Sequence, residues 1–218
     1  RYPDGDNNWT VFNTPTPGAQ NEEVIPEYPL IYINEFMPDN ETTIADDHGE
    51  YDDWIELYNP HTDPVNVGGW YMSDDPAEPA KWQIPADEPA LTTIPPDGFL
   101  LLWADEQPGQ GVLHLNFRLS SSGENITLSG NGADLTDQVS YGPLGQLEPP
   151  PTDSSGGRKS DGSPVWIIFE NPSPGTPNVY IPPVTGQIII NEFMASNDTF
   201  VADEFGEYDD WIELYNSS

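Results

Sequence analysis

The sequence has no cysteine, only five basic residues and no long apolar run, and each absence excludes a class of protein. Without cysteine there are neither disulfides nor thiolate metal ligands. The 38 acidic residues give a formal net charge of −33, which repels nucleic acid and anionic membranes because both are bound through Lys and Arg. No apolar run approaches the roughly 18 residues of a membrane-spanning helix. We therefore expect neither a nucleic-acid partner nor membrane insertion.

Aromatic residues, in contrast, are plentiful. Acidity combined with 25 prolines is typical of disordered chains, but the sequence also has 7 Trp, 10 Tyr and 8 Phe. These residues supply core material that disordered chains lack. The composition therefore predicts a folded, acidic, loop-rich protein.

The stretch GEYDDWIELYN occurs twice, at 49–59 and at 206–216. The offset of 157 residues extends the similarity well beyond this stretch. Residues 1–61 align with residues 158–218 without a gap and are identical at 31 of 61 positions. Self-similarity at a fixed period is the signature of a repeat architecture. We interpret the chain as a tandem repeat with a 157-residue period.

The repeat divides the chain into units and linkers. The expected order is the C-terminal end of a preceding unit (1–22), a linker (23–29), a complete unit (30–178), a second linker (179–186) and the N-terminal part of a following unit (187–218). Prolines in both linkers predict extended, semi-rigid connections.

Alternating apolar and β-branched residues predict an all-β fold. The strands expected in the complete unit are 30–37, 53–60, 65–73, 81–85, 98–104, 112–119, 124–130, 134–142 and 165–169. NGAD at 131–134 predicts a tight hairpin turn, and no stretch of about a dozen residues has a helical period. About nine short strands in one unit predict an immunoglobulin-like β-sandwich.

The motifs of this unit, taken in order, resemble a known family. They are INEFM, DWIELYN, VNVGGWYMSDD, KWQIP, GFLLLWAD, LHLNFRLSSSGENITL and NPSPGTPN. Together they resemble a bacterial lamin tail domain. The resemblance implies an immunoglobulin-like fold and an interaction module without catalytic activity. It also implies an exported protein, because bacterial lamin tail domains occur in such proteins, often repeated or beside other domains.

No catalytic residue is expected. The sequence contains no Walker motif, GxSxG or HExxH. His48 is replaced by Phe205 in the next unit, and His114 falls on the polar face of the expected strand 112–119, so we predict exposed histidines. Glu35 and Glu56 lie within strand patterns and are expected to be salt-bridged or solvent-facing rather than catalytic.

The acidic loop between the first two strands is the candidate metal site. Its carboxylates are Asp46, Asp47, Glu50, Asp52 and Asp53. Calcium takes six to eight oxygen ligands, and this loop contains many carboxylate oxygens. The spacing of these carboxylates along the sequence is not that of an EF-hand. The alternative is a solvated acidic loop without a metal. No other cofactor is expected.

Five asparagines, Asn8, Asn40, Asn125, Asn197 and Asn216, lie in sequons for N-glycosylation, and three of them are the candidate acceptors. They are Asn40, Asn197 and Asn125, and the first two occupy equivalent places in the repeat. If the source makes N-glycans, we expect these residues to be exposed acceptors.

The function expected from these observations is structural and non-catalytic. We expect a repeat of an extracellular or cell-surface fibre, filament or stalk, whose partners are neighbouring repeats of the same chain or identical subunits. The alternative is an accessory binding or adhesion module of a larger exported protein, with calcium as its one candidate ligand.

Overall fold

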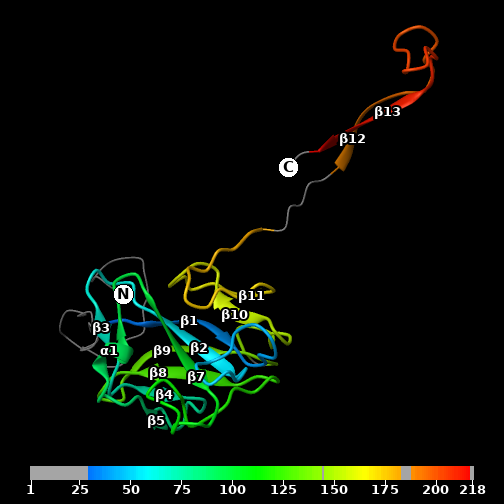
Figure 1. The fold of residues 1–218 in the computed structure, drawn as a ribbon. Helices are drawn as coiled ribbons and strands as arrows, with labels where there is room; N and C mark the ends of the chain where they lie inside the picture. Colours follow the sequence, from blue (N-terminus) through cyan, green and yellow to red (C-terminus); the bar gives the residue numbers. More distant parts are fainter. Residues whose placement is uncertain (1–28, 144, 183–187, 217–218) are drawn as a thin grey trace, which may run out of the picture. The chain divides into compact units, whose positions relative to one another are not determined.

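The computed structural model describes residues 29–143, 145–182 and 188–216 (Figure 1). The chain divides between Tyr180 and Ile181 into two compact units, which we describe separately. All strand pairs in the described residues are antiparallel, and the only helix there is the single turn α1 (Pro89–Thr92). The all-β fold predicted from the alternating pattern is therefore confirmed.

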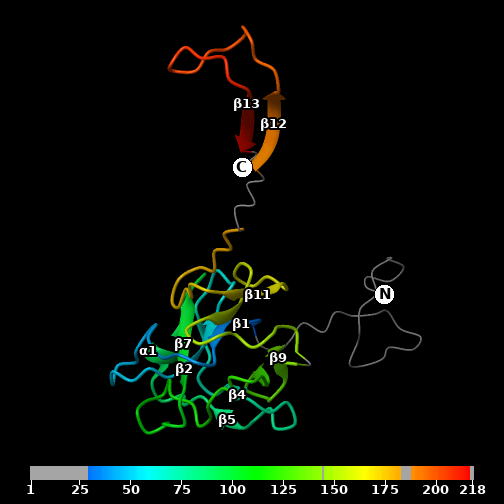
Figure 2. The ribbon, with the colours of Figure 1, turned by 90° about the vertical axis from the view of Figure 1, so that its right-hand side faces the viewer.

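The first unit contains two main sheets. The five-stranded sheet has the order β11-β10-β1-β2-β7, and the four-stranded sheet has the order β5-β4-β8-β9. In Figures 1 and 2 β4 and β5 lie below β1 and β11, and residues of both sheets share one hydrophobic core, so the unit is a two-layered sandwich. A third, short pair joins β3 (Val65–Asn66) to β6 (Thr93–Ile94).

Within the described part of the chain, the two main sheets together contain nine strands. The larger sheet consists of β1 (Tyr32–Met37), β2 (Asp53–Tyr58), β7 (Phe99–Ala104), β10 (Ser155–Arg158) and β11 (Trp166–Phe169). The smaller sheet consists of β4 (Tyr71–Ser73), β5 (Trp82–Gln83), β8 (Asn125–Ser129) and β9 (Leu135–Ser140).

The hydrophobic core is formed by residues from both sheets. Alternate residues of β1 and β2, including Phe36 and Ile55, pack with Leu128 of β8, and all three are fully buried. The opposite face of β2 is buried as well, because Trp54 packs in a second cluster to which Ile44 of the preceding loop contributes. The loop between β1 and β2 is therefore packed onto the sheet.

Two expected strands differ in the structure. Residues 112–119 form no regular strand and make only isolated bridges, from His114 to Trp103 and from Arg118 to Asp105. The expected strand 65–73 breaks into β3 and β4 because Gly69, with a φ of +89°, turns the chain between them. Alternation alone did not reveal either interruption.

Strand β10, in contrast, was missed. Its sequence SGGR has the composition of a turn, yet β10 pairs with both β1 and β11. Glycine is required here by close packing. A Cβ on Gly156 would lie 2.6 Å from the ring of Phe36, and one on Gly157 would lie 2.8 Å from the ring of Phe169.

The second unit is a hairpin of β12 (Ile188–Met194) and β13 (Trp211–Asn216). Its pairing repeats that of β1 with β2 at an offset of 157 residues, including the irregularity between Ile190 and Glu192, which corresponds to that between Ile33 and Glu35. Its apolar side chains are exposed, whereas their counterparts in the first unit are buried.

Residues 1–22 and 23–28, expected to end a preceding unit and to form most of the first linker, lie outside the described residues, as do residues 183–186 of the second linker and residue 187, the first of the expected following unit. Within the described residues no helix has the length and apolarity needed to cross a membrane.

Candidate metal centre

Asn40 fixes the start of the acidic loop. Its Nδ2 donates to the carbonyl oxygens of Ile44 and Asp52 at 2.7 and 2.8 Å, and the residue is only 5% exposed. The exposure predicted for a glycosylation acceptor is therefore wrong here. It is also wrong at Asn197, which is 4% exposed and whose Nδ2 donates to the equivalent carbonyl of Asp209. Asn125 is half-buried at the start of β8.

Asp46 forms the turn of the loop. Its Oδ1 accepts hydrogen bonds from the backbone N–H groups of His48 and Glu50, at 2.9 and 2.8 Å. Gly49 completes the turn with a φ of +84°, which favours glycine. The Asp46 side chain is fully buried, and its second oxygen, Oδ2, has no hydrogen-bond donor. A buried, unpaired carboxylate oxygen carries a desolvation cost and calls for a positively charged partner.

Asp52 and Asp105 lie close to the Asp46 carboxylate. One carboxylate oxygen of each, together with one of Asp46, forms a group whose members are within 4.8 Å of one another. The Oδ2 of Asp52 is also buried without a hydrogen-bond partner. Burial, followed by repulsion from Asp105, raises the pKa of Asp52. Three carboxylates brought together in this way favour a cation between them.

His114 is buried rather than exposed, so the prediction from strand alternation is wrong. The residue is 3% exposed because segment 111–118 folds back along β7, where the N–H of Leu115 donates to the carbonyl of Trp103 at 2.7 Å. Its Nδ1 lies 2.5 Å from Oδ2 of the buried Asp105. With one ring proton placed on Nδ1 in this bond, the lone pair of the imidazole lies on Nε2.

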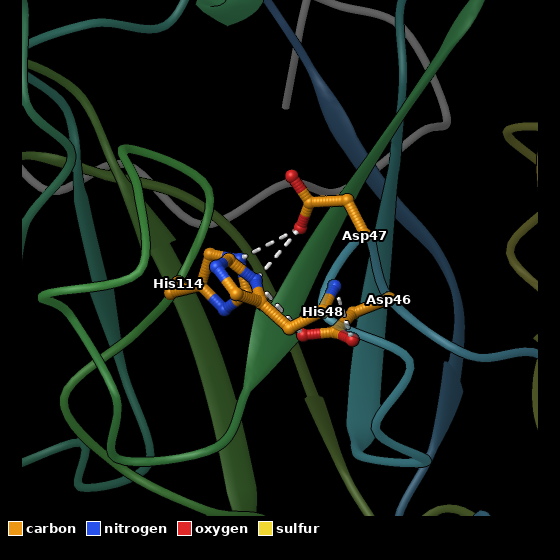
Figure 3. A group of neighbouring side chains, drawn as sticks. All are labelled: Asp46, Asp47, His48 and His114. Carbon is orange, nitrogen blue, oxygen red and sulfur yellow. Dashed lines mark hydrogen bonds and ion pairs between the residues drawn. The ribbon is translucent and has the colours of Figure 1, made fainter.

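A second group combines His114 with the loop. In Figure 3 the carboxylate of Asp47 points toward both imidazole rings. Asp47 Oδ1 lies 3.1 Å from His48 Nδ1 and 3.7 Å from His114 Nε2, and His48 Nδ1 lies 3.6 Å from Asp46 Oδ2. One ligand atom from each of these four residues falls within 4.8 Å of the others. Two nitrogens and two carboxylates thus converge.

The other predicted ligands have different partners. Glu50 Oε2 accepts hydrogen bonds from the side-chain amides of Gln107 and Gln110, at 3.2 and 2.7 Å. Asp53 lies in β2 and accepts the backbone N–H of Leu119 at 3.1 Å. Burial raises the pKa of Asp53 to about 7. Of the predicted ligands, the structure therefore places Asp46 in two groups, one with Asp47, His48 and His114 and one with Asp52 and Asp105.

The equivalent loop of the second unit keeps the turn but not the histidine. Asp203 Oδ1 accepts the N–H groups of Phe205 and Glu207, both at 2.9 Å, as Asp46 does in the first loop. Carboxylates of Asp203, Glu207 and Asp209 also lie within 4.8 Å of one another, but all three residues are exposed. Phe205 stands where the first loop has His48, so the nitrogen ligand has no counterpart there.

Glu35 and Glu56 are neither salt-bridged nor solvent-facing, contrary to expectation. Both are fully buried, and both bind the turn in segment 171–178. The N–H of Ser173 donates to Glu35 at 3.1 Å, and the N–H of Gly175 donates to Glu56 at 2.6 Å. Burial raises the pKa of both carboxyls, that of Glu56 to about 8. With their oxygens bound to this turn, these glutamates have a structural role.

Arg158 joins the two sheets of the sandwich. Its Nη2 donates to both carboxylate oxygens of Asp137 in β9, at 2.8 and 3.0 Å, and its Nε donates to the carbonyl of Ile33 in β1 at 2.7 Å. The rings of Tyr32 and Trp166 both lie 4.8 Å from the guanidinium carbon. The buried side chain of Arg158 therefore binds β10 to β1 in its own sheet and to β9 in the other sheet.

Comparison with protein families agrees with this architecture. A family model described as the Lamin Tail Domain matches residues 26–143, which is more than half of the chain. The chain belongs to the lamin tail domain family. This is an immunoglobulin-like, non-enzymatic family. Searches of curated proteins and of solved structures gave no match.

The matched region of this lamin tail domain stops before β10 and β11. The structure nevertheless places both strands in the five-stranded sheet, next to β1. The strand predicted at 165–169 is β11, but no short sequence motif indicated β10, because the bonds of Ser155 and Arg158 to Glu35 and Ile33 join residues more than a hundred positions apart. The sandwich therefore extends beyond the family match.

Proposed function

We propose that this chain is part of a non-catalytic array of lamin tail domains that forms an extracellular or cell-surface fibre, filament or stalk. In this array residues 30–178 are one complete unit, and residues 187–218 begin the next. Neighbouring units of the same chain, or identical subunits, are the partners. The segments 23–29 and 179–186 are the linkers between successive units.

The observation that carries this proposal is the hairpin β12–β13. It repeats the strand pairing of β1–β2 at every paired position, and its Asn191 amide donates to Glu213 just as Asn34 donates to Glu56. Yet Phe193 is 68% exposed, whereas its counterpart Phe36 is fully buried. A hairpin with the same sequence and the same pairing is expected to be covered by the same kind of sandwich.

Two further properties support a structural role outside the cell. The closing turn of the first unit binds the buried Glu35 and Glu56, which fits a structural rather than a catalytic role for these two carboxyls. The resemblance to bacterial lamin tail domains implies export, and an acidic surface at −33 favours solubility without attracting nucleic acid. Linkers rich in proline keep successive units at a limited separation.

The test is electron microscopy of the native protein, with measurement of its mass per unit length. The array predicts beaded filaments or stalks in which one bead corresponds to one 157-residue repeat. Globular, monodisperse particles at physiological salt would instead favour an accessory binding or adhesion module of a larger exported protein.

A second candidate function, calcium binding by the acidic loop, is favoured by the two buried, unpaired oxygens on Asp46 and Asp52 beside Asp105. Calcium bound only to the native state must raise the melting temperature. We expect millimolar calcium to stabilise the chain relative to chelator, and Asp52→Asn to remove the effect. Asp87→Asn, an exposed carboxylate outside the loop, is the control. Equal melting temperatures in calcium and chelator would leave a solvated acidic loop.

A further inference from the structure

We propose that Asp46, Asp47, His48 and His114 form a tetrahedral zinc site that links the loop between β1 and β2 to the segment beside β7. The proposal does not depend on the array. It differs from the calcium site in its ligand chemistry, since half of the ligand atoms are imidazole nitrogens. Imidazole suits zinc, whereas calcium takes oxygen ligands.

The spacing of the four side chains supports this assignment. Zinc binds nitrogen and oxygen at about 2.0–2.2 Å in a tetrahedron, so neighbouring ligand atoms are separated by roughly 3.3–3.6 Å. The three ligand–ligand distances given above, 3.1, 3.6 and 3.7 Å, lie close to this range. Small side-chain adjustments would suffice to close the shell.

The orientation of His114 supplies an independent argument. Its Nδ1 donates to the buried Asp105, an arrangement in which a carboxylate orients a zinc-binding histidine. Nε2 then presents a lone pair toward Asp47 Oδ1, which is itself an acceptor. Two acceptors that face each other require a proton or a cation between them, and zinc satisfies both.

Asp46 provides the observation that a surface acidic cluster lacks. Its side chain is fully buried and rigidly held, because Oδ1 accepts two backbone N–H groups, while Oδ2 faces the site without a hydrogen-bond donor. Asp47 is 80% exposed at its side chain, so an ion can enter from solvent. Four protein ligands without an open position are typical of a structural zinc site.

Such a site would act as a cross-link in a chain that has no cysteine. His114 is 66 residues from His48 in the sequence, and a metal that binds both stabilises the native state over the unfolded chain. The site would be particular to this unit, because the equivalent loop has Phe205 and Glu204 in place of His48 and Asp47.

The experiment is calorimetric titration of chain 1–218 with zinc chloride, at about 0.15 M salt and without calcium, because Asp46 belongs to both carboxylate groups. We expect one zinc ion per chain and a higher melting temperature. His48→Phe introduces the residue that the chain itself has at 205, and Asp47→Ala removes an exposed side chain, so both variants should fold. Each should lose at least about tenfold in zinc affinity.

Asp209→Asn in the second loop is the matched control and should leave zinc binding unchanged. Cobalt(II) in place of zinc should give the intense visible absorption of a tetrahedral centre, and His48→Phe should abolish it. Zinc binding that is absent, or that is equal in the unsubstituted chain and in both site variants, would overturn the proposal. Loss of binding in Asp209→Asn would do the same. A rise in melting temperature with calcium that persists in His48→Phe would come from the carboxylate group of Asp46, Asp52 and Asp105, and not from the zinc site.

Discussion

The hairpins β1–β2 and β12–β13 have nearly the same sequence and the same pairing, but they differ in what covers them. Ile33, Phe36 and Leu57 of the first hairpin are fully buried. Their counterparts Ile190, Phe193 and Leu214 are 63%, 68% and 62% exposed. The local sequence therefore determines the hairpin, its irregularity and its turn, whereas burial depends on the strands that follow.

The burial of the polar residues also depends on the strands that follow the hairpin. Glu56 is buried and binds the N–H of Gly175, while its counterpart Glu213 is exposed and bonds with Asn191 of its own hairpin. Contacts within the hairpin are present in both copies. Within residues 29–143, 145–182 and 188–216, contacts to closing strands are seen for the first hairpin, and these account for the buried network around Glu35 and Arg158.

The largest expected difference between the hairpins concerns the aromatic core. Phe36→Ala removes a fully buried ring that packs near Tyr141 and Trp166, and should lower the free energy of unfolding by about 3–5 kcal/mol. Phe193→Ala removes an exposed ring and should change it by less than about 0.5 kcal/mol. Urea denaturation followed by tryptophan fluorescence measures both values.

The reverse result would be equally informative. If Phe193→Ala destabilised the chain as much as Phe36→Ala, the apolar face of β12–β13 would be packed against something in solution, and the contrast between the hairpins would fail. Analytical ultracentrifugation of the same samples would then show whether a second copy covers that face.

Sequence alternation predicted most of this fold because a half-buried strand leaves a period of two in its residues. It identified β1, β2, β7, β8 and β9, as well as the turn at 131–134. It failed for β10, where Gly156 and Gly157 are set by the rings packed above them rather than by strand propensity. It also failed for 112–119, where the alternation continues although regular pairing does not.

The candidate site was predicted only in part, for a similar reason. The carboxylates of the acidic loop are close in sequence, so Asp46, Asp47 and Asp52 were recognised as a group. Asp105 and His114 reach them through the folding of the chain after β7. No local pattern indicates that meeting. The error at His114 followed directly from the incorrect strand at 112–119.

The buried Glu56 and its exposed counterpart Glu213 should also differ in how they make stability depend on pH. Glu56 has a pKa raised to about 8 by burial, against 4.5 for an ordinary glutamate, so the native state holds a proton that the unfolded chain releases. Stability is therefore fully present below pH 4.5 and falls as pH rises toward 8, on the order of 4–5 kcal/mol for this group. Glu35 and Asp137, whose pKa values are also raised by burial, act in the same direction.

Melting temperatures measured between pH 5 and pH 9 test this expectation. Glu56→Gln cannot ionise, so the decline should become shallower by about one proton. Glu213→Gln, its exposed counterpart, should leave the slope unchanged. A decline that is identical in Glu56→Gln and in the unsubstituted chain would show that the buried carboxyl does not govern this pH dependence.

The smallest expected effect concerns the loops, where the two hairpins are most alike. Asn40→Ala removes two hydrogen bonds to the carbonyls of Ile44 and Asp52, and should destabilise the first unit by about 1–2 kcal/mol. Asn197→Ala removes the equivalent bonds but should leave that unfolding transition unchanged, because its loop belongs to the other unit. Amide hydrogen exchange should show increased opening of each loop in its own variant. If Asn40→Ala left exchange in residues 41–52 unchanged, the loop would be held by Ile44 packing on Trp54 and Trp103 rather than by this asparagine.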